Sequence, residues 1–139
     1  MIRVVIDTNV LVSALLHAGG LPETVINLAV SGHVQWVASD PILAEYAAVL
    51  LRPRLAIDPD KAADAMARIR AATSLVMPTV RIAAASDPDD NMFLECAQAG
   101  DADYVVTGNV RHFPGTWGKT RVVTAAMPTS ERYAHSRAD

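Results

Sequence analysis

The sequence predicts an α/β fold: a three-layer sandwich with a central, mostly parallel sheet. Short runs of β-branched residues alternate along the chain with segments whose apolar residues recur at helical spacing. Strands that alternate with helices form parallel pairs, and the crossover helices then cover both faces of the sheet. Of the 139 residues, 51% are hydrophobic and 19% are charged, which suits a compact domain with a buried core.

The first two predicted strands enclose two helices. A run of β-branched residues at 2–6 predicts a buried strand, and the apolar segment 10–16 predicts a short helix that a pair of glycines ends. The next helix spans 21–32, with a proline in its first turn, where a missing N–H group loses no partner. The apolar stretch 33–38, between two turn signals, predicts the second strand.

Two amphipathic helices are predicted next. Residues 40–50 begin with a proline near the amino end and carry apolar residues at the spacing of one buried face. After a break at 52–54, the alanine-rich segment 59–73 predicts a second helix, whose small residues suit close packing, including packing across a dimer. The segment 74–82 predicts a short strand, or two strands interrupted by Pro78.

The last part of the chain predicts one helix and two strands. Asp87 is placed to cap a helix that opens at Pro88 and ends at Gly100. The β-rich runs 103–107 and 120–124 follow, separated by a loop with a proline and a glycine. These elements complete the alternation of strands and helices that a parallel sheet requires.

Composition limits the domain organisation and the class of function. We expect one domain over residues 1–126 and a tail, 127–139, that has too few apolar residues for more than a frayed helix or disorder. The formal net charge of −3 argues against a broad basic face that binds nucleic acid by neutralising phosphates. A single cysteine, Cys96, excludes an internal disulfide and a Cys-rich zinc site. With no signal-peptide pattern and no apolar run of about 20 residues, we expect a cytoplasmic protein outside the membrane.

Polar side chains stand where strands and loops give way to helices. Asp7 directly follows the first strand, and the carboxyl ends of parallel strands form the ligand crevice of such sheets. The alternative is that Asp7, Thr8 or Asn9 only caps the next helix. Glu45 falls on the shoulder of a buried helical face, where it must reach solvent, pair or bind something. Asp90 lies at the amino end of the buried stripe of its helix, and Asn109 follows the strand 103–107 as Asp7 follows the first.

Four oxygen-bearing side chains thus converge at one edge of the predicted sheet. Clustered carboxylates repel one another and take up protons unless a cation neutralises them. Ligands that offer only oxygen select Mg²⁺ or Mn²⁺ over zinc. A metal ion there supplies the positive charge that a phosphodiester needs and makes its bound water acidic. The pattern therefore predicts metal-assisted hydrolysis of a phosphodiester.

Four motifs carry a resemblance to a known family: VVIDTN at 4–9, the helix around Glu45, DPDD at 87–90, and VVTGN at 105–109 followed by His112-Phe113. In their order and spacing they resemble the PIN-domain ribonucleases, in particular the VapC-like toxins of bacterial type II toxin–antitoxin pairs. The resemblance extends from the first strand to about Val123. It implies a Mg²⁺- or Mn²⁺-dependent endoribonuclease, often a homodimer, that a cognate antitoxin holds inactive by filling its groove.

The resemblance also implies roles for single residues. Asp7, Glu45 and Asp90 match the three central acids of the family, which act in catalysis and hold the metal. Asn109 stands where many members carry a fourth acid; its amide oxygen can ligate a metal but brings no charge, which weighs against a second metal site. The residues that resemble supporting hydrogen-bonding groups are Asn9 and Thr107, and the candidate phosphate contacts are Arg52, Arg54 and Arg111.

Three other functions begin from a similar strand or fold. A haloacid-dehalogenase-type phosphatase needs a second aspartate two residues after the first, where this chain has Asn9. A response-regulator receiver needs an acidic pair at the first strand and a later lysine at a strand end, and the sequence has neither. The remaining alternative is a non-catalytic PIN-like RNA-binding or scaffold module; the presence of Asp7, Glu45 and Asp90 favours the enzyme.

Overall fold

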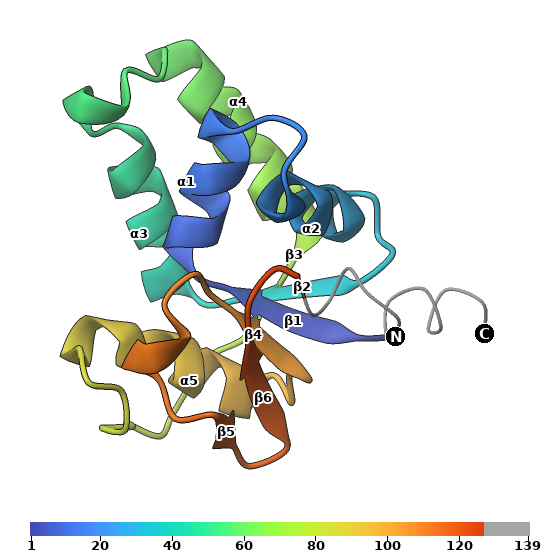
Figure 1. Ribbon diagram of the computed structural model, residues 1–139, viewed down its shortest axis with the longest axis vertical. Coiled ribbons are helices and arrows are strands. Elements are labelled where there is room, and N and C mark those ends of the chain that lie inside the picture. The colour runs from blue at the N-terminus through green and yellow to red at the C-terminus, as the bar shows by residue number, and fades with distance from the viewer. Residues whose placement is uncertain (127–139) are drawn as a thin grey trace.

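A six-stranded sheet forms the centre of the computed structural model, which describes residues 1–126 (Figure 1). The strand order is β3-β2-β1-β4-β6-β5, and every neighbouring pair is parallel except the antiparallel β5–β6 pair. The predicted tail, 127–139, lies outside the described residues. The strands are β1 (Arg3–Ile6), β2 (Gln35–Ala38), β3 (Thr73–Leu75), β4 (Tyr104–Val106), β5 (Thr116–Trp117) and β6 (Thr120–Val123).

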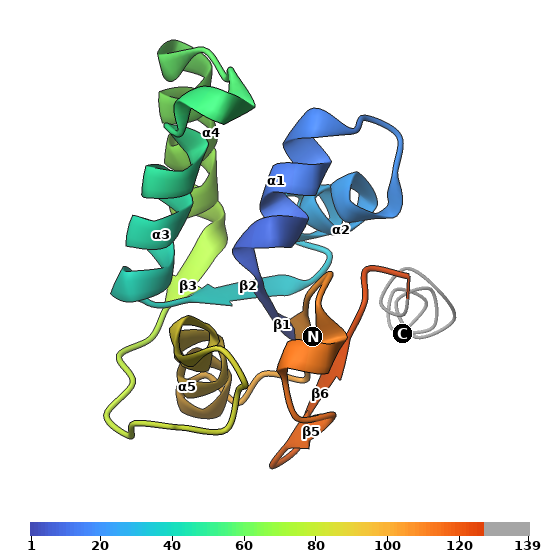
Figure 2. The ribbon, with the colours of Figure 1, turned by 60° about the vertical axis from the view of Figure 1, so that its left-hand side comes forward.

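Helices cover the two faces of the sheet unequally. Helices α1 to α4 lie on one side and α5 lies on the other (Figure 2), which confirms the three-layer α/β fold. Within residues 1–126, no single helix has the length and hydropathy to cross a membrane. Helices α1 and α2 meet the length and hydropathy criteria only when taken together, and they are bent by 106° relative to each other. The helices are α1 (Thr8–Leu16), α2 (Leu21–Val30), α3 (Asp40–Leu50), α4 (Pro59–Ala72) and α5 (Asn91–Ala99), with 3₁₀ turns at Pro53–Leu55, Pro88–Asp90 and Val110–His112.

The strand order reverses between β1 and β4. The chain runs outward from β1 through β2 to β3 with its helices on one face, then crosses back under the sheet through α5 to β4 (Figure 2). Right-handed crossovers require this change of face when the direction of travel changes. Ile6 pairs with Val106 in the β1–β4 register, so the residues that follow them, Asp7 and Thr107, are neighbours. Ligands of open parallel sheets bind at such a reversal.

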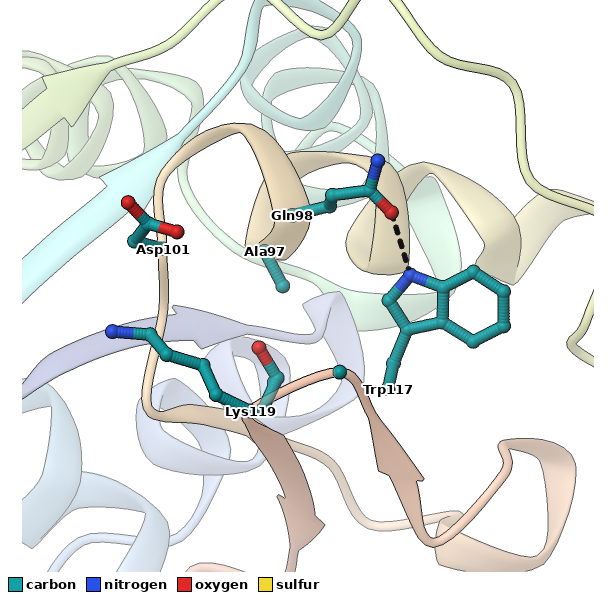
Figure 3. A pocket seen from close by; sticks show the side chains of 7 residues that line it. Ala97, Gln98, Asp101, Trp117 and Lys119 are labelled. Carbon is teal, nitrogen blue, oxygen red and sulfur yellow. Dashed lines mark hydrogen bonds between the residues drawn. The ribbon is translucent and has the colours of Figure 1, made fainter.

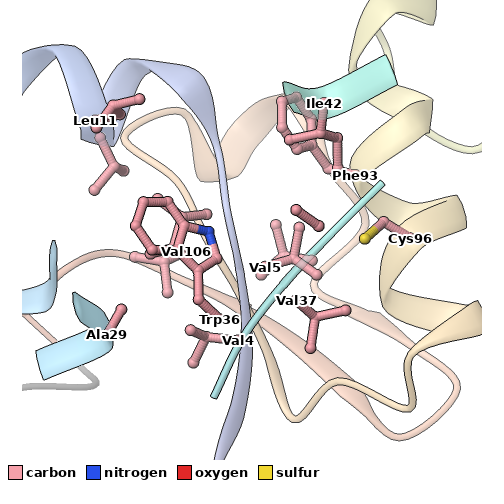
Figure 4. Packing of buried hydrophobic residues seen from close by; sticks show 14 of the residues in the cluster. Val4, Val5, Leu11, Ala29, Trp36, Val37, Ile42, Phe93, Cys96 and Val106 are labelled. Carbon is pink, nitrogen blue, oxygen red and sulfur yellow. The ribbon is translucent and has the colours of Figure 1, made fainter. Parts of the chain in front are cut away.

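The core lies on both faces of β1 and β2. Val4 and Trp36 point toward α1 and α2, whereas Val5 and Val37 point toward Phe93 on α5 (Figure 4). Each of these side chains is at most 1% exposed, and burial of an aliphatic or aromatic side chain stabilises the fold by about 1.5–3 kcal/mol. Alternate residues of each strand are therefore buried in different layers, which explains the continuous apolar runs that the sequence has there.

Two strand predictions differ from the structure. The strand predicted at 74–82 is shorter in the structure: the edge strand β3 spans only Thr73–Leu75. The chain beyond Leu75 is irregular through Pro78. An edge position and a proline both limit pairing. The strand β5 was not predicted, because its two residues are ordered by a tight turn at Gly118, with φ +57°, and not by a β-rich run.

Candidate active site

A pocket of about 440 Å³ opens at the carboxyl edge of the sheet, above the strand reversal. Asp7, Glu45, Asp90 and Asn109 all line it, although they come from four different elements. Asp7 follows β1, Glu45 lies in the second turn of α3, Asp90 ends the 3₁₀ turn before α5, and Asn109 follows β4. The structure thus brings the four oxygen-bearing side chains singled out from the sequence into the lining of one pocket.

Asp7 forms the buried floor of this pocket. It occupies the N-cap position of α1, but its side chain makes no capping hydrogen bond. Its Oδ2 instead accepts a hydrogen bond of 2.7 Å from the hydroxyl of Thr107, and that hydroxyl accepts one of 3.0 Å from the backbone N–H of Asn109. Asp7 is 6% exposed and Thr107 is 0% exposed. Helix capping alone therefore does not account for Asp7, because its carboxylate is also bonded to Thr107, the residue that follows β4.

Two adjacent residues of α3, Glu45 and Tyr46, form hydrogen bonds to the residues on either side of Asp7. The hydroxyl of Thr8 donates a hydrogen bond to Oε2 of Glu45. The hydroxyl of Tyr46 donates to the backbone carbonyl of Ile6. The Tyr46 bond is buried and the Thr8 bond is partly buried, and together they set the position of α3 against the end of β1.

Asp90 lies beside His112 in the lining of the pocket. Nδ1 of His112 lies 3.8 Å from Oδ2 of Asp90, and both residues line the pocket. The carbonyl of His112 accepts hydrogen bonds from the N–H of Ser86, at 2.8 Å, and from its hydroxyl, at 3.2 Å. Asp87 caps the 3₁₀ turn as predicted, since its Oδ1 accepts from the N–H of Asp89 at 3.0 Å. The two turns that carry Asp90 and His112 are thereby joined.

The pocket is electrostatically unfavourable for its own carboxylates. Burial raises the pKa of Asp7, and the charge of Glu45 raises it further against the effect of the Thr107 hydrogen bond. Burial, followed by the charges of Asp7 and Asp87, raises the pKa of Asp90 to about 6, while His112 opposes the rise. A cation in the pocket would relieve this repulsion.

The donor set fits a hard divalent cation. The three carboxylates and one amide offer only oxygen, which suits Mg²⁺ or Mn²⁺ better than zinc. Within residues 1–126, no group of three or more His, Cys, Asp or Glu side chains is arranged so that it could hold a metal ion. Since Mg²⁺ keeps several of its waters in protein sites, an open set of one or two carboxylates agrees with its chemistry.

The remaining predicted site residues divide into three groups. Asn9 lines the pocket, and its Oδ1 accepts a hydrogen bond of 3.2 Å from the N–H of Gly108. Arg52 and Arg54 are exposed at the pocket rim. Arg111 is exposed and does not line the pocket. Two cationic side chains, those of Arg52 and Arg54, therefore line the same pocket as the carboxylates, and that of Arg111 lies outside it.

Thr8 and His112 also line the pocket, although no sequence pattern predicts a role there for either residue. Thr8 is of a residue type that caps helices, and nothing in the sequence shows that a residue 37 positions later accepts its hydrogen bond. His112 belongs to the motif after β4, and that position was the only available signal for it.

A second pocket, of about 430 Å³, lies at the opposite edge of the sheet (Figure 3). It is framed by Asp101 at the end of α5 and by Lys119 in the β5–β6 turn, beside Trp117. The indole Nε1 of Trp117 donates a hydrogen bond of 2.8 Å to Oε1 of Gln98. With a single carboxylate in its lining, this pocket does not share the chemistry of the first.

Comparisons with known proteins show what this chain is similar to. A family model described as the PIN domain matches residues 3–111. The uncharacterized protein MJ1680 of Methanocaldococcus jannaschii is 28% identical over 111 residues, which cover 78% of this chain and 71% of that protein. The crystal structure of VapBC2 from Rickettsia felis, bound to a DNA fragment from its promoter, matches with a TM-score of 0.58 and 13% identity over 87% of this chain and 98% of that chain. At that identity, the structural match shows a shared fold.

Proposed function

The chain belongs to the PIN-domain family, and on this basis we propose that it is a metal-dependent endoribonuclease that hydrolyses RNA phosphodiester bonds, as the toxin of a type II toxin–antitoxin pair. One observation carries the proposal. Asp7, Glu45 and Asp90 line one pocket at the strand reversal, where burial and mutual repulsion raise the pKa of two of the three. Such a costly arrangement is typical of a functional site.

In this proposal Asp7, Glu45 and Asp90 are the catalytic residues, and together with Asn109 they hold Mg²⁺ or Mn²⁺. The metal ion, when bound, supplies an acidic water for attack on phosphorus and charge stabilisation of the leaving oxygen. Thr107 keeps the Asp7 carboxylate in place through its hydrogen bond. Asn9 supports the same edge by holding the backbone of Gly108.

We propose that arginines guide the RNA to this acidic pocket. The whole chain carries a formal net charge of −3, so overall charge does not attract a polyanion. Arg52 and Arg54 stand at the rim of the pocket, where they would contact phosphates on either side of the cleaved bond. Arg111, outside the lining, would contact the RNA farther from that bond.

The proposed partners follow from the likeness to a VapBC complex. We propose that a cognate antitoxin covers the pocket and blocks access of RNA, and that the protein is a homodimer. The working unit is the domain 1–126, and a cytoplasmic location gives it access to RNA. An assay of the isolated chain therefore starts without its inhibitor.

Cleavage of RNA by the purified chain tests this function. A pool of single-stranded and structured RNA is incubated with Mg²⁺, with Mn²⁺ and with EDTA. We expect the wild-type protein and Asp64→Asn, which changes an exposed acid on α4, to cleave only with metal. We expect Asp7→Asn to fold normally, because the amide keeps the shape of the side chain, and to lose cleavage. Cleavage by pure Asp7→Asn protein, or in EDTA, would contradict the proposal, and a folded protein inactive in every condition would favour a scaffold role.

A further inference from the structure

We propose that Thr8 is a positioning residue for Glu45: its hydroxyl holds one carboxylate oxygen so that the other is presented to the pocket. This inference rests on the proposed function and adds a residue to it. Thr8 follows Asp7 directly, so the same short segment would supply one metal ligand and orient another.

The two carboxylates nearest the strand reversal are held in the same way. Oδ2 of Asp7 is held by the hydroxyl of Thr107, from the neighbouring strand end. Oε2 of Glu45 is held by the hydroxyl of Thr8, from the neighbouring helix. Each carboxylate thus has one oxygen engaged by a threonine of another element. For Glu45, the second oxygen, Oε1, is the one that this arrangement would present to a ligand in the pocket.

The anchor for Glu45 is itself rigid. Thr8 is 6% exposed and lies in the first turn of α1. Its β-branched side chain has few rotamers, so its hydroxyl keeps one direction. On the other side, Tyr46 is 0% exposed and bonded to the carbonyl of Ile6, which fixes the backbone of α3 next to Glu45. The bond therefore joins two firmly placed elements through one flexible side chain.

Glu45 needs such an anchor more than Asp7 does. A glutamate has one more side-chain torsion than an aspartate, and Glu45 is only half-buried. The charge of Asp7 repels it. Without the Thr8 hydroxyl, the carboxylate is free to turn away toward solvent, which relieves the repulsion but removes the ligand. Loss of a hydrogen-bond partner behind a metal ligand typically costs about 10–100-fold in metal affinity.

Calorimetric titration of the full chain with Mn²⁺ tests the role without relying on activity. We expect Thr8→Val, which keeps the shape and removes the hydroxyl, to weaken Mn²⁺ binding at least about tenfold. We expect Thr8→Ser to restore binding close to that of wild type. Thr120→Val is the matched control, since it removes a buried hydroxyl that donates 2.6 Å to the carbonyl of Ala102 at the far edge of the sheet. It should bind Mn²⁺ like wild type.

A double-mutant comparison shows whether Thr8 acts through Glu45. If it does, Thr8→Val lowers Mn²⁺ affinity in the wild-type background but not in Glu45→Ala, where the partner is already gone. An equal loss in both backgrounds, or full affinity of Thr8→Val, overturns the inference. Should Thr8→Val fail to fold, Thr8→Ala takes its place with the same criteria. Absence of Mn²⁺ binding by the wild type overturns the proposed metal site itself, and the inference with it.

Discussion

Replacement of Asp90 by asparagine should stabilise the metal-free protein at neutral and alkaline pH. Burial and the charges of Asp7 and Asp87 raise the pKa of Asp90, so its ionised form is unfavourable in the folded state. The folded protein binds the Asp90 proton more tightly than the unfolded chain does. Stability from this group is therefore fully present below about pH 4 and is lost as the pH rises through about 6. Asp90→Asn removes the charge and hence this loss.

The size of the effect follows from the pKa change. The pKa of Asp90 rises from the ordinary 3.8 to about 6. At about 1.4 kcal/mol per pH unit, this rise changes the free energy of unfolding by at most about 3 kcal/mol. The Asp90 side chain is 19% exposed at the mouth of an open pocket, so water and salt reduce the effect to about 1 kcal/mol. In a domain of this size, that raises the melting temperature by about 4 °C.

Thermal unfolding in EDTA, followed by circular dichroism, measures the difference. At about pH 8 we expect Asp90→Asn to melt above wild type, and near pH 4 we expect the two to coincide. Asp64→Asn, on exposed α4, should follow wild type at both values. Added Mn²⁺ should stabilise wild type more than Asp90→Asn, because binding to the folded state raises stability by mass action. A melting temperature of Asp90→Asn at or below that of wild type at pH 8 would refute the electrostatic reasoning.

Two further predictions concern the metal and the core. Asn109→Asp adds a fourth carboxylate to the pocket, so Mn²⁺ should bind about tenfold more tightly by calorimetry; unchanged or weaker affinity would show that this side chain is not a ligand. Gly100→Ala should cost about 1–3 kcal/mol in urea unfolding, because its Cβ would meet Cγ1 of Val37 at 2.5 Å and the carbonyl of Cys96 at 3.2 Å. Gly115→Ala, with nothing within 4 Å of its Cβ, is the control, and equal midpoints for the two variants would count against this packing.

Local sequence patterns sufficed for the fold class and for much of the pocket. The buried runs that became β1, β2 and β4 are apolar on both faces, as parallel strands between helices require. A polar residue after such a run stands at the carboxyl edge, which is why Asp7 and Asn109 were placed together. Glu45 and Asp90 were found because each interrupts an apolar helical face.

Contacts between distant side chains could not be predicted in the same way. Whether Asp7 caps its helix or bonds to β4 depends on the strand order, since Thr107 is adjacent only because β4 pairs with β1. The Thr8–Glu45 bond depends on the angle at which α3 lies against α1, and no periodicity encodes that angle. The hairpin strand β5 arises from a two-residue turn and has no strand-like run of its own.

The separation between Asp7 and Thr107 has a consequence for the protein during its synthesis. The bond that holds the Asp7 carboxylate joins residues 100 positions apart. A nascent chain that has reached β3 already contains Asp7 and Glu45, but not the α5 crossover or the β4 strand that complete the pocket. Because loop closure over such a distance comes late in folding, the growing polypeptide on the ribosome passes through the synthesis of β1, β2 and β3 without an assembled pocket. The order of the strands thus delays assembly of the pocket until the segment around Thr107 has been made.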